Sequence, residues 1–191
     1  MSNSSSCFKA VLCTGCLLLS GVAAAHRADQ AVGIYLEGGQ APHTEGDTNA
    51  FTIGVVVPWS HREPPAPPGA LSFYWDIFLS NWSAPVPSGR ERGSYTQAGV
   101  IANWRWRFSQ GESPWFVEAG VGGTVMDSIY RTASREFSTA FQFTEQIGFG
   151  RNFGAQGEHE LSFRFQHFSN AGIKEPNPGE NFWRVRYLYR F

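Results

Sequence analysis

Apolar and polar residues alternate through most of this chain, in eight separate segments. A period of two is typical of β-strands that present one apolar and one polar face. An even number of such strands predicts an all-β fold in which the strands close into an antiparallel barrel. The eight apolar stripes lie within residues 32–36, 51–59, 71–79, 100–108, 115–125, 137–149, 161–165 and 183–191.

The composition of the other face indicates which side of the strands meets lipid. It carries arginine and glutamate, but Lys174 is the one lysine that follows Lys9. A soluble β-sandwich or lipocalin-like barrel, the alternative fold, turns its apolar face inward and exposes a face rich in lysine. We therefore predict an eight-stranded transmembrane barrel with an apolar outer wall and paired charges in a narrow lumen. The aromatic content of 15% fits girdles at the membrane interfaces, and the terminal Phe191 resembles an outer-membrane sorting signal.

The first 25 residues read as a signal peptide, so the barrel domain is expected to span residues 26–191. Lys9 gives a positive start, an apolar stretch follows at residues 10–19, and alanines at 23–25 offer a cleavage site. The chain is therefore predicted to be exported to the bacterial outer membrane. After this segment there is no run of about 18 apolar residues, so no transmembrane helix is predicted. All the cysteines belong to the signal segment, which excludes disulfides and thiol chemistry in the barrel: Cys7, Cys13 and Cys16.

Charge and histidine spacing exclude several other classes of function. The formal charge is −1 and becomes −2 when Lys9 is removed, so no nucleic-acid partner is expected. We also predict no metal and no cofactor, because three histidines lie in predicted connections without the spacing of metal ligands: His43, His61 and His159. The sequence leaves open whether the barrel forms a homodimer.

The connections between strands are predicted to alternate between the two sides of the membrane. With both termini in the periplasm, the segments around residues 61–69, 109–113 and 151–158 face the periplasm. The segments around residues 41–48, 81–94, 128–136 and 169–180 then face outward.

The clearest indication of chemistry is His-Phe-Ser-Asn-Ala-Gly at residues 167–172, followed by Pro-Asn-Pro-Gly-Glu-Asn at residues 176–181. A serine becomes a nucleophile when a base lies beside it. His167 and Ser169 end a stripe that faces lipid, so both are expected on the outer face, about 6.6 Å apart along the strand. The alternative interpretation is that this strand has only reached the headgroup level, where polar residues are tolerated.

This longer motif resembles the signature of the outer-membrane lipid A 3-O-deacylases (PagL type). The resemblance is close over residues 165–183 and looser over most of the barrel. It implies an eight-stranded barrel with an outward Ser-His-Glu triad. It also implies that lipid A is the substrate, and that the hydroxyacyl chain ester-linked at its 3-position is removed without a metal. The expected function is a serine esterase that remodels lipopolysaccharide.

Carried over by position, the resemblance makes Ser169 the nucleophile and His167 the general base. Asn170 then belongs to the oxyanion site, either by donating from its amide or by fixing the local backbone. The backbone N–H groups of Ala171 or Gly172 complete that site, and the glycine permits a close approach.

The third member of the triad is left between two residues. An ungapped match to the family places its glutamate on Asn181, with Glu180 one residue earlier. A carboxylate stabilises an imidazolium better than an amide does, which favours Glu180 if a one-residue bulge turns it outward. Outward parity favours Asn181, and an asparagine orients the histidine of Cys-His-Asn sites. We give preference to Glu180 and keep Asn181 as the alternative.

Glu145 interrupts the apolar stripe of residues 137–149. In a hairpin it is expected opposite residue 161, about 26 Å from Ser169, which is too far to serve the site. A bulge or a lumen-facing ion pair is the favoured interpretation.

Two other functions stay open. One is a non-catalytic structural or lipid-binding barrel, and the other is a phospholipase or another acyl-ester hydrolase on the same scaffold. Lys174, in the loop after the motif, is either a contact for a lipid A phosphate or a solvated loop residue.

Overall fold

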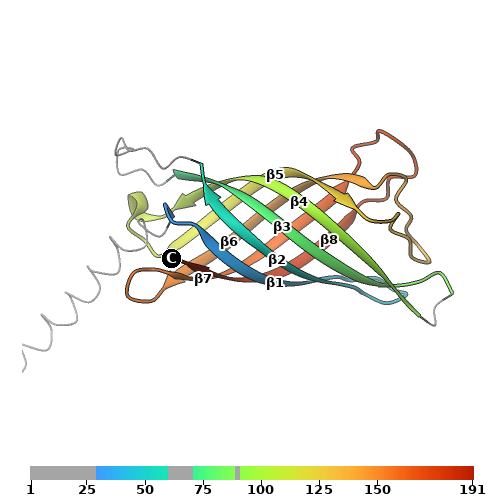
Figure 1. Cartoon of the computed structure of the whole chain (residues 1–191), viewed down its shortest axis with the longest axis horizontal. Coiled ribbons are helices and arrows are strands. Elements are labelled where there is room, and N and C mark those ends of the chain that lie inside the picture. The colour runs from blue at the N-terminus through green and yellow to red at the C-terminus, as the bar shows by residue number, and fades with distance from the viewer. Residues whose placement is uncertain (1–28, 60–70, 89–90) are drawn as a thin grey trace, which may run out of the picture.

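The computed structural model describes residues 29–59, 71–88 and 91–191, in which eight strands close into an antiparallel barrel (Figure 1). Each strand pairs with its neighbours in the sequence, and the first strand closes on the last. The predicted fold is therefore confirmed. The strands are β1 (Gly33–Ala41), β2 (Thr48–Pro58), β3 (Leu71–Pro85), β4 (Arg92–Arg107), β5 (Trp115–Met126), β6 (Phe141–Phe153), β7 (His159–Ser169) and β8 (Glu180–Arg190).

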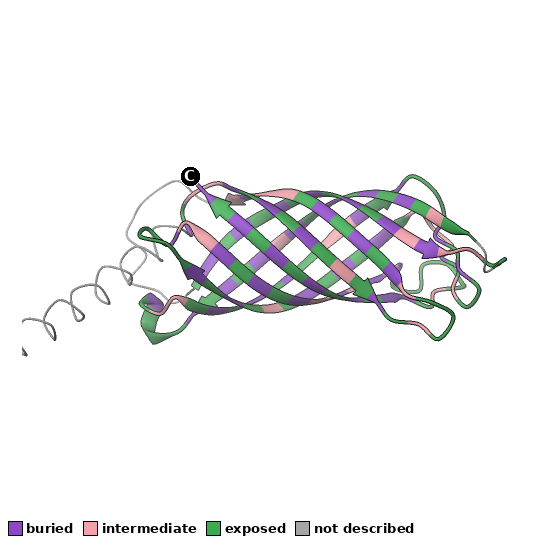
Figure 2. Cartoon of the chain, turned by 90° about the horizontal axis from the view of Figure 1, so that it is seen from below, coloured by how far each residue is buried: buried purple, intermediate pink, exposed green. Residues whose placement is uncertain are grey.

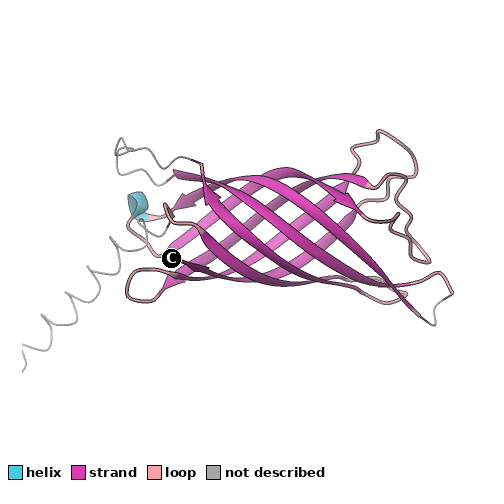
Figure 3. Ribbon diagram, in the orientation of Figure 1, coloured by secondary structure: helices cyan, strands magenta, loops and turns pink. Residues whose placement is uncertain are grey.

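Helical structure is limited, in the described ranges, to one short 3-10 turn, η1 (Ser109–Gly111), at the end of the barrel that carries the C-terminus (Figure 3). In the same ranges, no helix is long and apolar enough to span a membrane. The predicted signal peptide, His61 and the expected connection at residues 61–69 lie outside the described residues.

Buried and exposed residues alternate along the strands (Figure 2), so successive side chains point in turn to the lumen and to the outer wall. In β3, Trp75 and Ile77 are 37% and 45% exposed, whereas Asp76 between them is fully buried. This alternation confirms the predicted facing of the apolar stripes, with one correction. Phe137 is buried against Trp82, because the chain before β6 folds over the barrel end and the Phe137 N–H donates to the Tyr130 carbonyl.

Paired charges fill much of the lumen, as predicted. The guanidinium of Arg105 lies among three carboxylates, those of Asp29, Glu118 and Glu160, at 2.9, 2.8 and 2.6 Å. Such pairing offsets part of the cost of removing charges from water. A second group joins Glu37 to Arg184 and Arg186, and Arg186 to Asp76.

An aromatic cluster closes the end of the lumen that lies away from the C-terminus. Trp82 lies at its centre, with ring centroids 4.9 Å from Phe168, 4.5 Å from Phe182 and 5.4 Å from Tyr130. Phe168 and Phe182 are fully buried, so the lumen side of β7 and β8 is fixed by packing at this level.

The two ends of the barrel differ in their connections. The end with the C-terminus, here called the terminal end, carries η1 and the β6–β7 turn (Figure 1). The other, the loop end, carries the β1–β2, β3–β4, β5–β6 and β7–β8 connections. There residues 127–140 and 170–179 lie together, since the Ser138 hydroxyl donates to the Lys174 carbonyl at 2.7 Å.

Candidate active site

β7 and β8 place a histidine and an asparagine side by side on the outer wall. His167 pairs with Asn181 in the strand register, and both side chains point away from the lumen. Imidazole Nδ1 lies 2.7 Å from Asn181 Oδ1. Because an amide oxygen only accepts hydrogen bonds, Nδ1 carries the hydrogen, and Nε2 is left free to take a proton.

Ser169 lies on the same face of β7 as His167, two residues closer to the loop end. Phe168 between them is fully buried, so parity puts both polar side chains outward, as predicted. No hydrogen bond between the serine and the imidazole is recorded in the described structure. Catalytic hydrogen bonds of this kind often tighten only when substrate binds.

Gly179 makes room for the imidazole. It adopts a φ of +65°, and a Cβ atom at this position would lie 2.7 Å from His167 Cε1 and 3.4 Å from Nε2. The last pair in the register of β7 and β8 is Phe168 with Glu180. The next residues along the two strands are Ser169 and Gly179, so Gly179 lies beside Ser169. The ring therefore leans toward the level of the serine. Nothing in the local sequence pattern indicates this role of Gly179.

Glu180 points into the barrel and does not face His167. The register of β7 and β8 runs from His159 to Phe168 without a bulge, so the outward turn that we expected for Glu180 is absent. Its side chain is 1% exposed, and its Oε2 accepts hydrogen bonds from Tyr130 at 2.8 Å and His43 at 2.9 Å. Of the two alternatives, Asn181 is the one that contacts the imidazole.

Glu180 instead ties three connections of the loop end together. Burial, with the neighbouring Glu180 carboxylate, raises the pKa of Tyr130 well above its usual value, so this hydroxyl stays protonated and donates. Arg135 approaches the same carboxylate at 3.9 Å and donates to the Gly179 carbonyl at 2.7 Å. These contacts hold the chain just before β8, beside the imidazole.

Asn170 holds the turn that follows Ser169. Its amide donates to Ser138 Oγ at 2.9 Å and to the Lys174 carbonyl at 2.7 Å, while its oxygen accepts from the Gly172 N–H at 2.9 Å. The residue is buried, and these contacts hold the backbone of the turn. The Gly172 N–H is occupied by this contact. Lys174 is exposed in the loop, and no contact of its ammonium group is recorded in the described residues.

Glu145 lies next to His167, contrary to the sequence prediction. β6 continues to Phe153, which pairs with His159 across a short turn, and counting back along both strands puts Glu145 opposite His167. Our expected partner at residue 161 was wrong because it assumed a different turn position. Glu145 is exposed on the outer wall, so neither the bulge nor the lumen-facing pair that we favoured is present.

An apolar hollow of about 420 Å³ opens on the outer wall below the site, toward the terminal end. Phe165 and Trp183, two residues from His167 and Asn181 on the same face, contribute to its lining, with ring centroids 4.8 Å apart. The other lining residues come from β5, β6 and β7: Val117, Glu118, Ile147, Gly148, Phe149 and Phe163. The hollow therefore lies next to His167 and Asn181 along β7 and β8.

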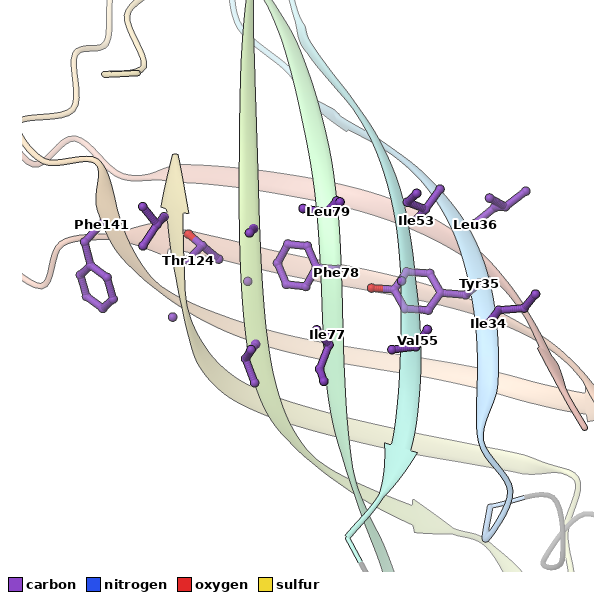
Figure 4. Close-up of a pocket in the computed structure, with 16 residues that line it drawn as sticks. Ile34, Tyr35, Leu36, Ile53, Val55, Ile77, Phe78, Leu79, Thr124 and Phe141 are labelled. Atoms are coloured by element: carbon purple, nitrogen blue, oxygen red, sulfur yellow. The ribbon is translucent and has the colours of Figure 1, made fainter. Parts of the chain in front are cut away.

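A larger apolar hollow, of about 900 Å³, crosses β1 to β6 elsewhere on the wall (Figure 4). Its lining includes Leu36, Ile53 and Leu79, together with the small residues Ala98 and Gly123. None of the candidate site residues lines it.

Comparison with known proteins identifies the family of this chain. The model of the family described as lipid A 3-O-deacylase (PagL) matches residues 49–190. The lipid A deacylase PagL of Bordetella bronchiseptica is 38% identical over 159 residues, which are 83% of each chain. The chain belongs to the lipid A 3-O-deacylase family.

A second relative and two solved structures are also similar to this chain. The lipid A deacylase PagL of Pseudomonas aeruginosa is 27% identical over 137 residues, 72% of this chain and 75% of that protein. The crystal structure of the outer membrane enzyme PagL matches with a TM-score of 0.64 at 20% identity, over 82% of this chain and 99% of that chain. The Yersinia pestis outer membrane protein Ail matches with a TM-score of 0.52 at 10% identity, over 85% and 99% of the two chains. These structural matches support the barrel fold.

Proposed function

We propose that this chain is an outer-membrane esterase that removes the 3-O-linked hydroxyacyl chain of lipid A, with Ser169 as nucleophile and His167 as general base. Family membership supports the reaction and the substrate. The observation that supports the residue roles is the outward pair of His167 and Asn181, beside Ser169, at the edge of an apolar hollow.

The site acts by acyl transfer to serine. His167 Nε2 takes the hydroxyl proton as Ser169 Oγ attacks the ester carbonyl carbon. The bond to the sugar oxygen then breaks, and that oxygen receives the proton from the imidazolium. Water, deprotonated by the same imidazole, cleaves the acyl-serine, which releases the hydroxy fatty acid and returns the proton to Ser169. Asn181 keeps the proton on Nδ1 throughout, so that Nε2 remains the base.

The turn after Ser169 supplies a donor for the developing oxyanion. The backbone N–H groups of Asn170, Gly172 and Ile173 are already bonded, to Asn177 Oδ1, Asn170 Oδ1 and the Asn170 carbonyl. In the described structure, no such partner is recorded for the N–H of Ala171, whose φ is +55°. We assign this N–H to the oxyanion, with Asn170 holding the turn in place.

The hollow below the site receives the acyl chain. A chain lying over Phe165 and Trp183 puts its ester at the level of His167 and leaves the sugar at the loop end. The loop end then lies at the outer surface of the outer membrane, and the substrate stays in its leaflet. This arrangement favours a long acyl ester over a soluble one.

The deciding experiment replaces Ser169 by alanine in a bacterial host whose lipid A keeps its 3-O-hydroxyacyl chain. Wild-type protein is expected to remove one hydroxyacyl group in the lipid A mass spectrum, and Ser169→Ala to remove none. Ser128→Ala, an exposed serine at the same end of the barrel, is the matched control and should act as wild type. A barrel that only binds lipid predicts the same spectrum for all three proteins. Equal cleavage of phospholipid by the purified protein would instead favour a general acyl hydrolase.

A further inference from the structure

Glu145 is a carboxylate on a wall that otherwise meets lipid. Its neighbours along the outer face of β6 are Phe143 and Ile147, 36% and 62% exposed. No hydrogen bond or ion pair of the Glu145 side chain is recorded in the described part of the chain. A charged group on the lipid face of a barrel lowers stability, so its presence calls for a compensating role.

The register places this carboxylate directly beside the imidazole. Glu145 on β6, His167 on β7 and Asn181 on β8 form one row across three strands, all pointing outward. Directly opposite residues of antiparallel strands have Cβ atoms about 4.5–5.5 Å apart, well within the reach of a glutamate. The imidazole therefore lies between an amide on one side and a carboxylate on the other.

We infer that Glu145 is the acidic group of this site and acts through His167 as a positioning residue. This inference rests on the proposed function. Asn181 fixes the ring and its tautomer but brings no charge, whereas the imidazolium that forms during the reaction needs a negative neighbour. Glu145 supplies that charge from the neighbouring strand, so the two tasks of a triad carboxylate are divided between β6 and β8.

Other charged groups near the imidazole are differently placed. On β8, Glu180 faces the lumen, where His43 and Arg135 approach it. In the connection between β7 and β8, Lys174 and Glu175 are exposed to solvent. Glu145, in contrast, lies on the outer wall with His167 and directly opposite it in the register of β6 and β7.

The test compares purified Glu145→Gln with wild type in detergent micelles containing lipopolysaccharide, with release of hydroxy fatty acid followed over a range of substrate concentrations. The variant keeps the size of the side chain and removes its charge. We expect kcat/KM to fall about tenfold or more, as for loss of a neighbouring charge in a partly desolvated site. The loss should fall on kcat more than on KM, because the charge acts on the imidazolium that forms during the reaction and not on substrate binding. Glu112→Gln, the same change on an exposed residue at the terminal end, should match wild type.

A second pair of variants tests whether the charge or the position of Glu145 is needed. Asn181→Glu places a carboxylate on the other side of the ring, and in the Glu145→Gln background it should restore activity to within about threefold of wild type. Non-additivity of this kind reports coupling between neighbouring residues.

Three results would overturn the inference: activity of Glu145→Gln within about twofold of wild type, a loss of activity confined to KM, or no rescue by Asn181→Glu. Heat-modified gel mobility shows that each variant is folded. If wild type itself releases no fatty acid, the proposed function fails, and this inference fails with it. If wild type is active and Glu145→Gln equally so, the inference alone is lost.

Discussion

At the scale of single residues, substitutions of Asn181 and Glu180 separate the activity of the site from the stability of the barrel. Asn181→Ala removes the acceptor of the imidazole Nδ1–H, so the ring is free to turn and Nε2 is no longer held as the base. We expect the rate of lipid A deacylation by purified protein to fall at least about tenfold, whereas the free energy of unfolding should change by less than about 0.5 kcal/mol, because Asn181 is exposed. Glu180→Gln should show the reverse pattern: it should lower the stability of the loop end, and it should reduce the deacylation rate less than Asn181→Ala does. Equal rates for Asn181→Ala and wild type would exclude the orienting role.

Parity along a strand was enough to predict the facing of His167 and Ser169, because each side chain follows directly from the one before it. The positions of Glu180 and Glu145 depend on information that a single strand does not hold. Glu180 faces inward because β7 and β8 pair without a bulge, and Glu145 reaches His167 because of where the β6–β7 turn lies. A shift of a few residues in a predicted turn moves a cross-strand neighbour by twice that number.

At the scale of elements, the chain leaves room for the imidazole just before β8 because residue 179 is a glycine. Gly179→Ala combines a left-handed backbone, which costs a residue with a Cβ about 1–2 kcal/mol, with a contact of 2.7 Å to His167 Cε1. We expect nearly complete loss of deacylation, measured in the host lipid A mass spectrum. Gly172→Ala is the matched control: its φ is also positive, but the space around a new Cβ is open. If both variants lose the same activity, backbone strain and not displacement of the ring is the cause.

The connections were harder to predict than the strands. The alternation of residues 141–149, continued back along the chain, predicts that Phe137 faces outward. In the structure it packs on Trp82 inside the barrel end, where the chain is not yet a strand. A local period carries no information about packing between distant segments, and the same limit applies to Asn170, whose partner Ser138 lies 32 residues away.

At the scale of the whole molecule, the closed barrel could be predicted because one rule, a period of two, holds for all eight strands and leaves no edge unpaired. The presence of paired charges in the lumen followed from the scarcity of lysine. The identity of the pairs did not, because strand register decides which side chains meet. Arg105 joins Glu118 on the adjacent β5 but also Glu160 on β7, across the lumen.

This network gives a prediction for the stability of the barrel. Arg105→Leu leaves Asp29, Glu118 and Glu160 without their common partner in the lumen. Removing one partner of a buried ion pair costs about 3–5 kcal/mol, so the urea midpoint of unfolding, followed by gel mobility, should fall clearly below that of wild type. Val100→Leu, which introduces the same residue on the outer wall of the same strand, should leave the midpoint unchanged, since Val100 is 44% exposed to the membrane side. An unchanged midpoint for Arg105→Leu would mean that the lumen charges contribute little net stability, and that packing and the closed hydrogen-bond ladder hold the barrel instead.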